Sequence, residues 1–319
     1  MTTPKSKAPA PAERTMALVP PIPKRSHAEN LALLKARAKP GPVVLPGDLM
    51  IAASPVAPLA QLPIWAEAVR GVPNAILRSA LFGAIKRGKR AYQQRVKKAS
   101  VEGVTVIHTG PQLDQADLDV WVQCLHLART GGLGTRLQFS ARGFLKAIER
   151  GAGGKDIEWL KGAFARLSSS VVEVEEGKRA YFGPMLVDGA RDDETGRYVI
   201  EMNPKIVALF GADGWSIVEL EARRALKKQP LSQWVHGFYT SHARPYPMKV
   251  ETLHRLCGSE NKELKGFRRE LGQALERLAD VTGWTWDIDD GDLVHVMKAG
   301  TDSQKRHLAK RKKLSTGTG

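Results

Sequence analysis

Residues 241–298 constrain the fold more than any other part of the chain. They read, in order, as a short strand, a short helix, a tight turn, a long helix and a hairpin. In the long helix, expected over residues 261–282, apolar side chains recur at spacings of three and four, so one face must be buried. These side chains are Leu264, Phe267, Leu271, Ala274, Leu275 and Leu278. The order of elements predicts a winged helix-turn-helix.

Polar side chains occupy the other faces of this helix. Lys262, Lys265, Arg269 and Gln273 form a row that a DNA groove could receive. Any solvated helix carries such charges, so the row alone does not separate a DNA-binding surface from an ordinary exposed face.

The composition points to a polyanionic partner. The 319 residues are enough for two ordinary domains, and 49 Lys and Arg against 33 Asp and Glu give a formal net charge of +16. No apolar run approaches the roughly 20 residues that span a bilayer, and the N-terminus lacks a secretory core, so we expect a cytoplasmic protein with no membrane partner. Cys124 and Cys257 lie in apolar helical patterns, which is typical of reduced core thiols.

The basic excess lies mostly at the two ends. Residues 1–63 hold 12 of the 19 prolines with eight basic and three acidic residues, and residues 299–319 hold six basic and one acidic residue. Both segments are predicted to be disordered. The DNA affinity of the folded middle must therefore depend on where its charges are placed.

A short peptide near residue 63 has two interpretations. Gln61, Leu62, Ile64 and Trp65 are similar to the peptide by which bacterial proteins dock on the sliding clamp. The alternative is that Trp65 anchors the tail to the first domain.

The rest of the chain alternates short helices and strands. We expect helices over 75–85, 114–129, 141–150, 155–169, 204–210 and 221–241, with a restart or kink at Pro230. Strands are expected over 96–99, 104–108, 136–140, 171–176, 198–202 and 215–220.

An internal repeat links the two halves. The apolar positions Ile157, Leu160, Phe164 and Leu167 correspond to Leu264, Phe267, Leu271 and Ala274 at a constant offset of 107 residues. The predicted fold is α+β, with two tandem winged-helix (helix-turn-helix) domains. The first covers 64–215, and the second, with its connector helix, covers 216–298.

No pattern typical of an enzyme or a cofactor site is found. The run GAGGK at 151–155 has Glu149 where a phosphate-binding loop needs its first glycine, and Asp156 replaces the magnesium-binding Ser or Thr. His236 and His242 are six residues apart and lie on different helix faces. The acidic residues at 287–292 lack the spacing of a calcium loop, so they are read as a solvated hairpin tip. We expect binding without catalysis, metal or cofactor.

Three segments carry a resemblance to a known family. SHARPYPMKVETLHRLCGS at 241–259, DDGDLVH at 289–295 and PNAILRSALF at 73–82 resemble the TrfA-type plasmid replication initiators, over roughly residues 65–296. The resemblance implies a protein that binds repeated origin sequences (iterons) in double-stranded DNA, opens an adjacent AT-rich region and recruits the host helicase and initiator. It also implies that the first domain mediates dimerisation and that monomers are the form active at the origin.

Ten residues are candidates for DNA contact. In the second domain they are Lys262, Lys265, Arg268, Arg269 and Gln273, with Ser259 and Asn261 capping the helix and touching phosphate. In the first domain they are Lys155, Lys161 and Arg166. Two alternatives remain open: a transcriptional repressor with the same fold that does not open an origin, and an enzyme acting on DNA.

Overall fold

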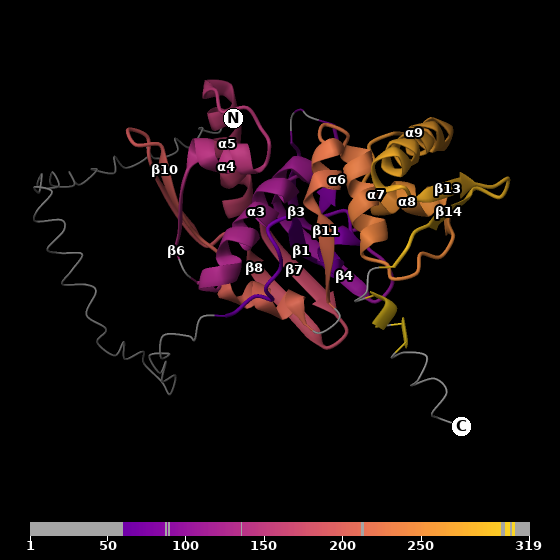
Figure 1. Ribbon diagram of the computed structural model, residues 1–319, viewed down its shortest axis with the longest axis horizontal. Coiled ribbons are helices and arrows are strands. Elements are labelled where there is room, and N and C mark those ends of the chain that lie inside the picture. The colour runs from indigo at the N-terminus through magenta and orange to yellow at the C-terminus, as the bar shows by residue number, and fades with distance from the viewer. Residues whose placement is uncertain are drawn as a thin grey trace, which may run out of the picture. The chain divides into compact units, whose positions relative to one another are not determined.

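A computed structural model describes residues 60–86, 88, 90–134, 136–211, 214–300, 304–306 and 308–309 (Figure 1). These residues form a mixed helix and strand structure, as the α+β prediction requires. Most of the two predicted tails lies outside the described residues. No helix in the described part of the chain is both long and apolar enough to cross a membrane.

The predicted helix over 75–85 is wrong. Only α2, Asn74–Leu77, is helical, and β2, Phe82–Gly83, follows it. Neighbouring segments take the amides that a longer helix would need: Ala80 N–H donates to Ala99 O at 2.7 Å and Ala84 N–H to Cys257 O at 2.7 Å. Apolar side chains are buried all around this segment, so their helical spacing did not mark one buried face.

A four-stranded antiparallel sheet forms much of the first half. Its order is β3 (Tyr92–Lys98), β4 (Val104–Pro111), β7 (Val171–Glu176) and β8 (Arg179–Pro184). The predicted hairpin of 96–99 with 104–108 is confirmed and is longer than expected. Strand β7 pairs with β4 and β8, so it belongs to this sheet and not to the sheet of the predicted repeat.

Helix α3, Gln115–Gly131, begins with a complete capping box. The Asp114 carboxylate accepts hydrogen bonds from the amides of Ala116 and Asp117, and the Asp117 carboxylate accepts one from the amide of Asp114. Such a box satisfies amides that the first turn leaves unpaired. The predicted start at residue 114 is therefore the capping residue.

The predicted repeat is present as a repeated topology. The first copy runs β6 (Arg136–Ser140), α4 (Ala141–Ala147), α5 (Gly154–Ser168), β9 (Asp188–Asp192) and β10 (Arg197–Glu201). The second runs β12 (Met248–Lys249), α8 (Val250–Leu256), α9 (Leu264–Thr282), β13 (Thr285–Ile288) and β14 (Leu293–Met297). The sheet orders are β6-β10-β9 and β12-β14-β13, so in both copies the last strand pairs with the first and lies between the other two.

The helical pattern of the repeat holds at three of its four positions. Leu160, Phe164 and Leu167 are buried in α5, as are their counterparts in α9, Phe267, Leu271 and Ala274. The fourth pair is not buried, since Ile157 is half-buried and Leu264 is 40% exposed. Leu264 is the first residue of α9, three residues after the predicted start, so it lies at the edge of the core.

The connector is two helices and not one. After β1 (Val69–Pro73) pairs with β11 (Trp215–Glu219), the chain forms α6 (Leu220–Ala225) and then α7 (Pro230–Thr240). Pro230 occupies the first turn of α7, the position where its missing N–H costs nothing. The restart predicted at Pro230 is confirmed, and η1 (Pro204–Phe210) has the predicted bounds.

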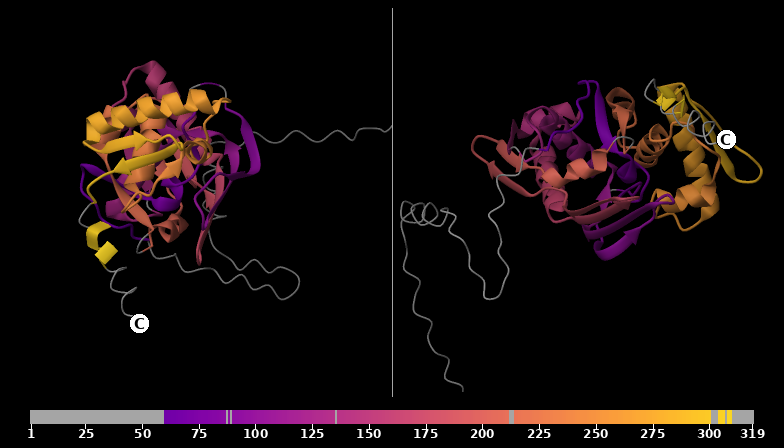
Figure 2. Two further views of the ribbon diagram at one scale, coloured as in Figure 1. Left: turned by 90° about the vertical axis from the view of Figure 1, so that its right-hand side faces the viewer. Right: turned by 90° about the horizontal axis from the view of Figure 1, so that it is seen from below.

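Buried apolar side chains form two clusters. One is drawn from residues 62–218 and the other from residues 226–296. Hydrogen bonds join the elements around them: Trp234 Nε1 donates to Ser79 O at 3.2 Å, and Arg78 Nε donates to Ser241 Oγ at 3.0 Å. Figures 1 and 2 show α6 between the pair α4 and α5 and the pair α8 and α9.

Candidate nucleic-acid interface

The outward face of α9 carries a row of free polar side chains. Lys265, Arg269 and Gln273 are exposed and follow one another at intervals of four residues, so they lie on one face of the helix. Lys262 is exposed just before the helix begins. Among the described residues none forms an ion pair with Lys262, Lys265 or Arg269. The positive charges that sequence periodicity placed on this face are therefore available to a partner.

These cations lie at the positive end of the helix dipole. The first turn of α9 holds no acidic residue, and Glu263 at the N-cap makes no capping hydrogen bond with its side chain. Cations at this end weaken a helix by a few tenths of a kcal/mol, whereas an anion is stabilised there. Helix stability therefore does not explain Lys262 and Lys265, whose charges suit an anion at this end of the helix.

The exposed surface of α9 becomes more acidic toward its C-terminus. Among the exposed residues that follow Gln273, Glu276 and Asp280 are acidic, and Arg277, four residues after Gln273, is basic. The Glu276 carboxylate accepts a hydrogen bond of 3.1 Å from Trp286 Nε1 of β13. The N-terminal half of α9 is thus the more basic half of the helix.

Arg268 differs from its neighbours. Its Nε lies 2.7 Å from Asp292 Oδ1, and Nη2 donates to the carbonyls of Ile288 at 3.3 Å and Asp289 at 3.4 Å. Asp289 and Asp292 belong to the turn between β13 and β14, and Ile288 is the last residue of β13. The predicted role of Arg268 in reading DNA is not tested by these contacts, but they give the side chain a second role, which is to hold this turn against α9.

Ser259 and Asn261 shape the turn before α9 and do not cap the helix. Ser259 Oγ accepts from the Asn261 amide at 3.2 Å, and Asn261 Oδ1 accepts from the Glu263 amide at 3.1 Å. The helix begins at Leu264, so both side chains lie outside it, and the predicted capping is wrong. The reason is that the local turn satisfies these amides before the helix starts.

Asp289 organises the turn between β13 and β14. Its carboxylate accepts hydrogen bonds of 2.9 Å from the amides of Gly291 and Leu293 and from His295 Nε2. The hydrogen bond from His295, followed by those from the backbone, lowers the pKa of Asp289 below its ordinary value. In the part of the chain that the structure describes, no three His, Cys, Asp or Glu side chains are grouped as metal ligands would be.

The corresponding face of α5 is far less basic. Lys155 is exposed, but Lys161 pairs with Glu158 at 2.9 Å and with Asp193 at 3.3 Å. Arg166 donates to the buried carboxylate of Asp117, with Nη2 2.7 Å from Oδ1. Lys161 and Arg166, predicted to contact DNA, thus form ion pairs within the fold, because Glu158 lies one turn away and Asp193 and Asp117 approach from distant parts of the sequence.

The peptide at 61–65 is packed into the first cluster. Leu62 and Trp65 are buried, and Trp65 Nε1 donates to His126 Nδ1 at 3.1 Å while its ring stacks on Phe210. Gln61 Nε2 donates to Arg129 O at 2.7 Å, and Ile64 is 79% exposed. These contacts correspond to the anchoring alternative. Docking on a sliding clamp would require Leu62 and Trp65 to leave the core.

The fold also brings together cations that the sequence did not single out. Lys86, Lys227 and Lys228 are exposed and line one cavity, although about 140 residues separate the first from the other two. Their signal in the sequence is two short basic runs, KRGKR at 86–90 and KK at 227–228. Neither run indicates that they meet.

A helix with free cations at its N-terminal half, set against a three-stranded sheet, is typical of proteins that bind double-stranded DNA. The chain belongs to the TrfA family, whose description is "TrfA protein" and which matches residues 50–298. It is 27% identical over 244 residues to the plasmid replication initiator protein TrfA of Escherichia coli, covering 72% of this chain and 62% of that protein. It is also 24% identical over 200 residues to RepFIB replication protein A of Escherichia coli, covering 59% of this chain and 61% of that protein. The chain thus matches about three fifths of the length of these relatives.

A solved structure shares the fold, and a second is more distantly similar. Domains 2 and 3 of RctB superpose with a TM-score of 0.50 at 13% identity, covering 71% of this chain and 99% of theirs. The Pi initiator protein in complex with iteron DNA gives a TM-score of 0.43 at 12% identity, covering 62% of this chain and 99% of that one.

Proposed function

We propose that the protein is a plasmid replication initiator that binds iterons in double-stranded origin DNA. The observation that carries the proposal is the free row of Lys265, Arg269 and Gln273 on α9, in a chain that belongs to the TrfA family. A relative that is 27% identical is named a plasmid replication initiator. In this proposal the two copies of the repeated topology are tandem winged helices, which their common strand order supports.

The N-terminal half of α9 enters the major groove. Arg269 lies at the centre of the free row, where a guanidinium can donate two hydrogen bonds to the O6 and N7 atoms of guanine. Gln273, one turn further, suits the N6 and N7 atoms of adenine. Lys262 and Lys265, near the positive end of the helix, suit phosphate oxygens. Base reading therefore rests mainly on two side chains.

The first copy contributes less to base reading. The exposed face of α5 presents Glu158 and Ala165 together with one free cation, Lys155. A face of this kind makes contacts through shape more than through charge. The second copy thus supplies most of the specificity, and the first fixes position along the duplex.

The proposed function has three further parts. The protein opens an adjacent AT-rich region, recruits the host helicase and initiator, and dimerises through its first domain. Family membership is what supports them. Permanganate footprinting of a supercoiled origin tests the first of these. Reactive thymines beside the bound repeats are expected, and unreactive thymines would leave a repressor that binds an operator without opening it.

The test of sequence-specific binding is selection of bound duplexes from a random pool. Wild-type protein is expected to enrich one consensus that recurs beside its own gene. Replacing Arg269 with Ala should weaken binding to that consensus by about 1–3 kcal/mol and relax the preference at one base pair. Lys178→Ala, which removes an exposed cation in the turn between β7 (Val171–Glu176) and β8 (Arg179–Pro184), is the control and should leave the consensus unchanged. Equal binding of consensus and random duplex by the wild-type protein would refute the proposal.

A further inference from the structure

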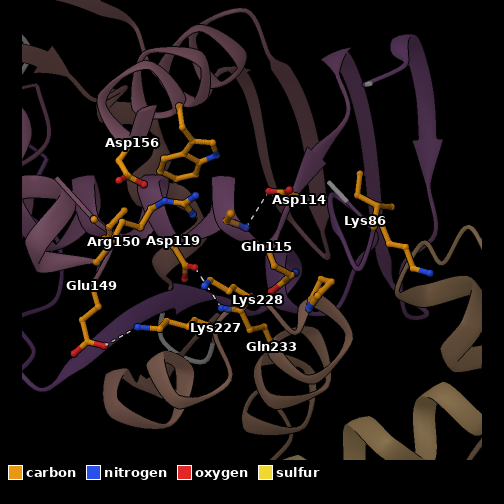
Figure 3. Close-up of a pocket in the computed structure, with 16 residues that line it drawn as sticks. Lys86, Asp114, Gln115, Asp119, Glu149, Arg150, Asp156, Lys227, Lys228 and Gln233 are labelled. Carbon is orange, nitrogen blue, oxygen red and sulfur yellow. Dashed lines mark hydrogen bonds and ion pairs between the residues drawn. The ribbon is translucent and has the colours of Figure 1, made fainter. Parts of the chain in front are cut away.

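A cavity of about 640 Å³ lies between the first copy of the repeat and the connector (Figure 3). One side is formed by the turn between α4 and α5 and by the first two turns of α5, including Asp156 and Trp159. The other side is formed by the turn between α6 and α7, with Lys227 and Lys228. The start of α3 and Lys86 complete the lining.

The acidic side chains of the cavity are neutralised from outside it. Asp114 pairs with Arg90 and Asp119 with Arg223, and Glu149 lies 3.4 Å from Arg224 Nη1. None of these three arginines lines the cavity. Three of its four carboxylates are therefore balanced by cations that no ligand in the cavity would contact.

The lysines of the cavity are left largely unbalanced. Lys86 and Lys228 are exposed and form no ion pair with any residue that the structure describes. Lys227 reaches Glu149 only at 3.9 Å, and Glu149 already faces Arg224. Arg150 lies over the ring of Trp159 at 3.4 Å, which keeps a further cation beside the cavity. The lining is thus suited to an anion.

Lys228 adopts an unusual backbone conformation. Its φ is +67°, in the left-handed region that follows many helices and that strongly favours glycine. A lysine at this position works against local stability. The chain nevertheless places an exposed lysine there, and this lysine lines a cavity that Lys86 and Lys227 also line.

We propose that this cavity binds the DNA backbone in the stretch of duplex between α5 and α9. Lys86, Lys227 and Lys228 contact the phosphates. The inference rests on the proposed function. The cavity adjoins the first turn of α5, which the repeated topology equates with the basic end of α9. Its opposite side leads into α7, which packs against α9. In the proposed complex, a duplex that meets both helices passes the mouth of the cavity. These phosphate contacts add affinity that does not depend on the DNA sequence.

The test is the salt dependence of binding to the selected consensus duplex, measured with the full chain. Each phosphate contact that is lost should reduce the slope of log K against log salt by about 0.9. Lys228→Gly and Lys86→Ala are expected to weaken binding several-fold near 100 mM salt, to lower the slope by roughly one each, and to select the same consensus. Lys178→Ala, an exposed lysine in the turn between β7 and β8, is the control and should change neither quantity.

Lys228→Gly separates binding from folding, because glycine fits the left-handed conformation better than lysine does. Its thermal unfolding temperature should equal or exceed that of the wild type while its DNA affinity falls. Lys228→Gly and Lys86→Ala could both keep the wild-type slope of log K against log salt while Arg269→Ala still binds the consensus more weakly. That result would overturn the cavity proposal and leave the proposed function standing. If the wild-type protein binds consensus and random duplexes equally well, the proposed function itself is refuted.

A small anion as occupant is a further outcome that the same variants detect. Wild-type protein would then be stabilised against heat by inorganic phosphate or ATP at constant ionic strength, and Lys228→Gly would not. Such stabilisation together with an unchanged DNA salt slope would overturn the proposal. The proposal is supported if phosphate and ATP do not stabilise the wild type and the variants show a reduced DNA salt slope.

Discussion

Arg268 of α9 lies 2.7 Å from Asp292, at the turn between β13 and β14, and so ties the helix to the hairpin that follows it. Asp292 itself has a left-handed φ of +58°. The pair thus links the proposed reading helix to a turn whose backbone is already constrained. Adjacent residues of α9 then have separate roles, since Arg268 faces the hairpin and Arg269 faces solvent.

Replacing Arg268 with Gln should change stability and DNA binding only slightly. Its side chain is 44% exposed and that of Asp292 is 50% exposed, so the ion pair contributes less than about 1 kcal/mol. A double-mutant cycle with Asp292→Asn, followed by urea unfolding, measures this coupling. In binding assays Arg268→Gln should lose less than Arg269→Ala and keep the same consensus. A changed consensus with Arg268→Gln would show that Arg268 reads a base.

Arg166 should matter for folding far more than for DNA. The Asp117 carboxylate that it binds is fully buried, and removing one partner of a buried pair costs about 3–5 kcal/mol. Arg166→Met should therefore lower the free energy of unfolding by that amount in urea. Lys155→Met, an exposed lysine of the same helix, should stay within about 0.5 kcal/mol of the wild type.

Adding Asp117→Asn to Arg166→Met should recover part of the loss, because the unpaired charge is then removed. A stable Arg166→Met protein with weakened DNA binding would return Arg166 to the candidate interface.

Local patterns predicted elements that local contacts determine. Strand β6 and helix η1 have the predicted bounds, and η1 begins where the Asn203 side chain accepts a hydrogen bond from the Lys205 amide. The segment 75–85 failed because its amides bond to residues near 99 and 257. A pattern of apolar residues contains no information about such distant partners.

The same limit applies to the candidate site. The exposure of Lys265, Arg269 and Gln273 follows from helical periodicity and was predictable. The pairing of Arg166 with Asp117 joins residues 49 positions apart, and the pairing of Arg268 with Asp292 joins residues 24 apart. Charge alone did not distinguish these arginines from a free one, because only the tertiary fold places a carboxylate beside them.

Trp65→Ala should destabilise the protein by about 3–5 kcal/mol, the usual cost of removing a large aromatic side chain from a core. The Trp65 ring packs against Phe210 and Trp215, at centroid distances of 6.0 and 5.9 Å. Ile64→Ala, one residue away but exposed, should have little effect. Urea unfolding of both variants makes the comparison. Unchanged stability in Trp65→Ala would contradict the anchoring role and favour a docking peptide.

Protonation of His236 should destabilise the fold in mild acid. The side chain is 1% exposed, and burial, with Arg223 and Lys298 nearby, lowers its pKa from 6.5 to about 3. Because the folded pKa is the lower one, the unfolded chain binds the proton first. The contribution of His236 is therefore complete above about pH 6.5 and is lost as the pH falls toward 3.

His236→Leu should remove that part of the pH dependence. One proton corresponds to about 1.4 kcal/mol per pH unit, so the wild type should lose about 2 kcal/mol more than the variant between pH 6.5 and pH 5. Urea unfolding at several pH values in this range measures the difference. His108 and His242, whose pKa values burial lowers to about 4, give both proteins a common remaining slope. A difference between the two proteins that stays constant with pH would show that His236 does not titrate in this way.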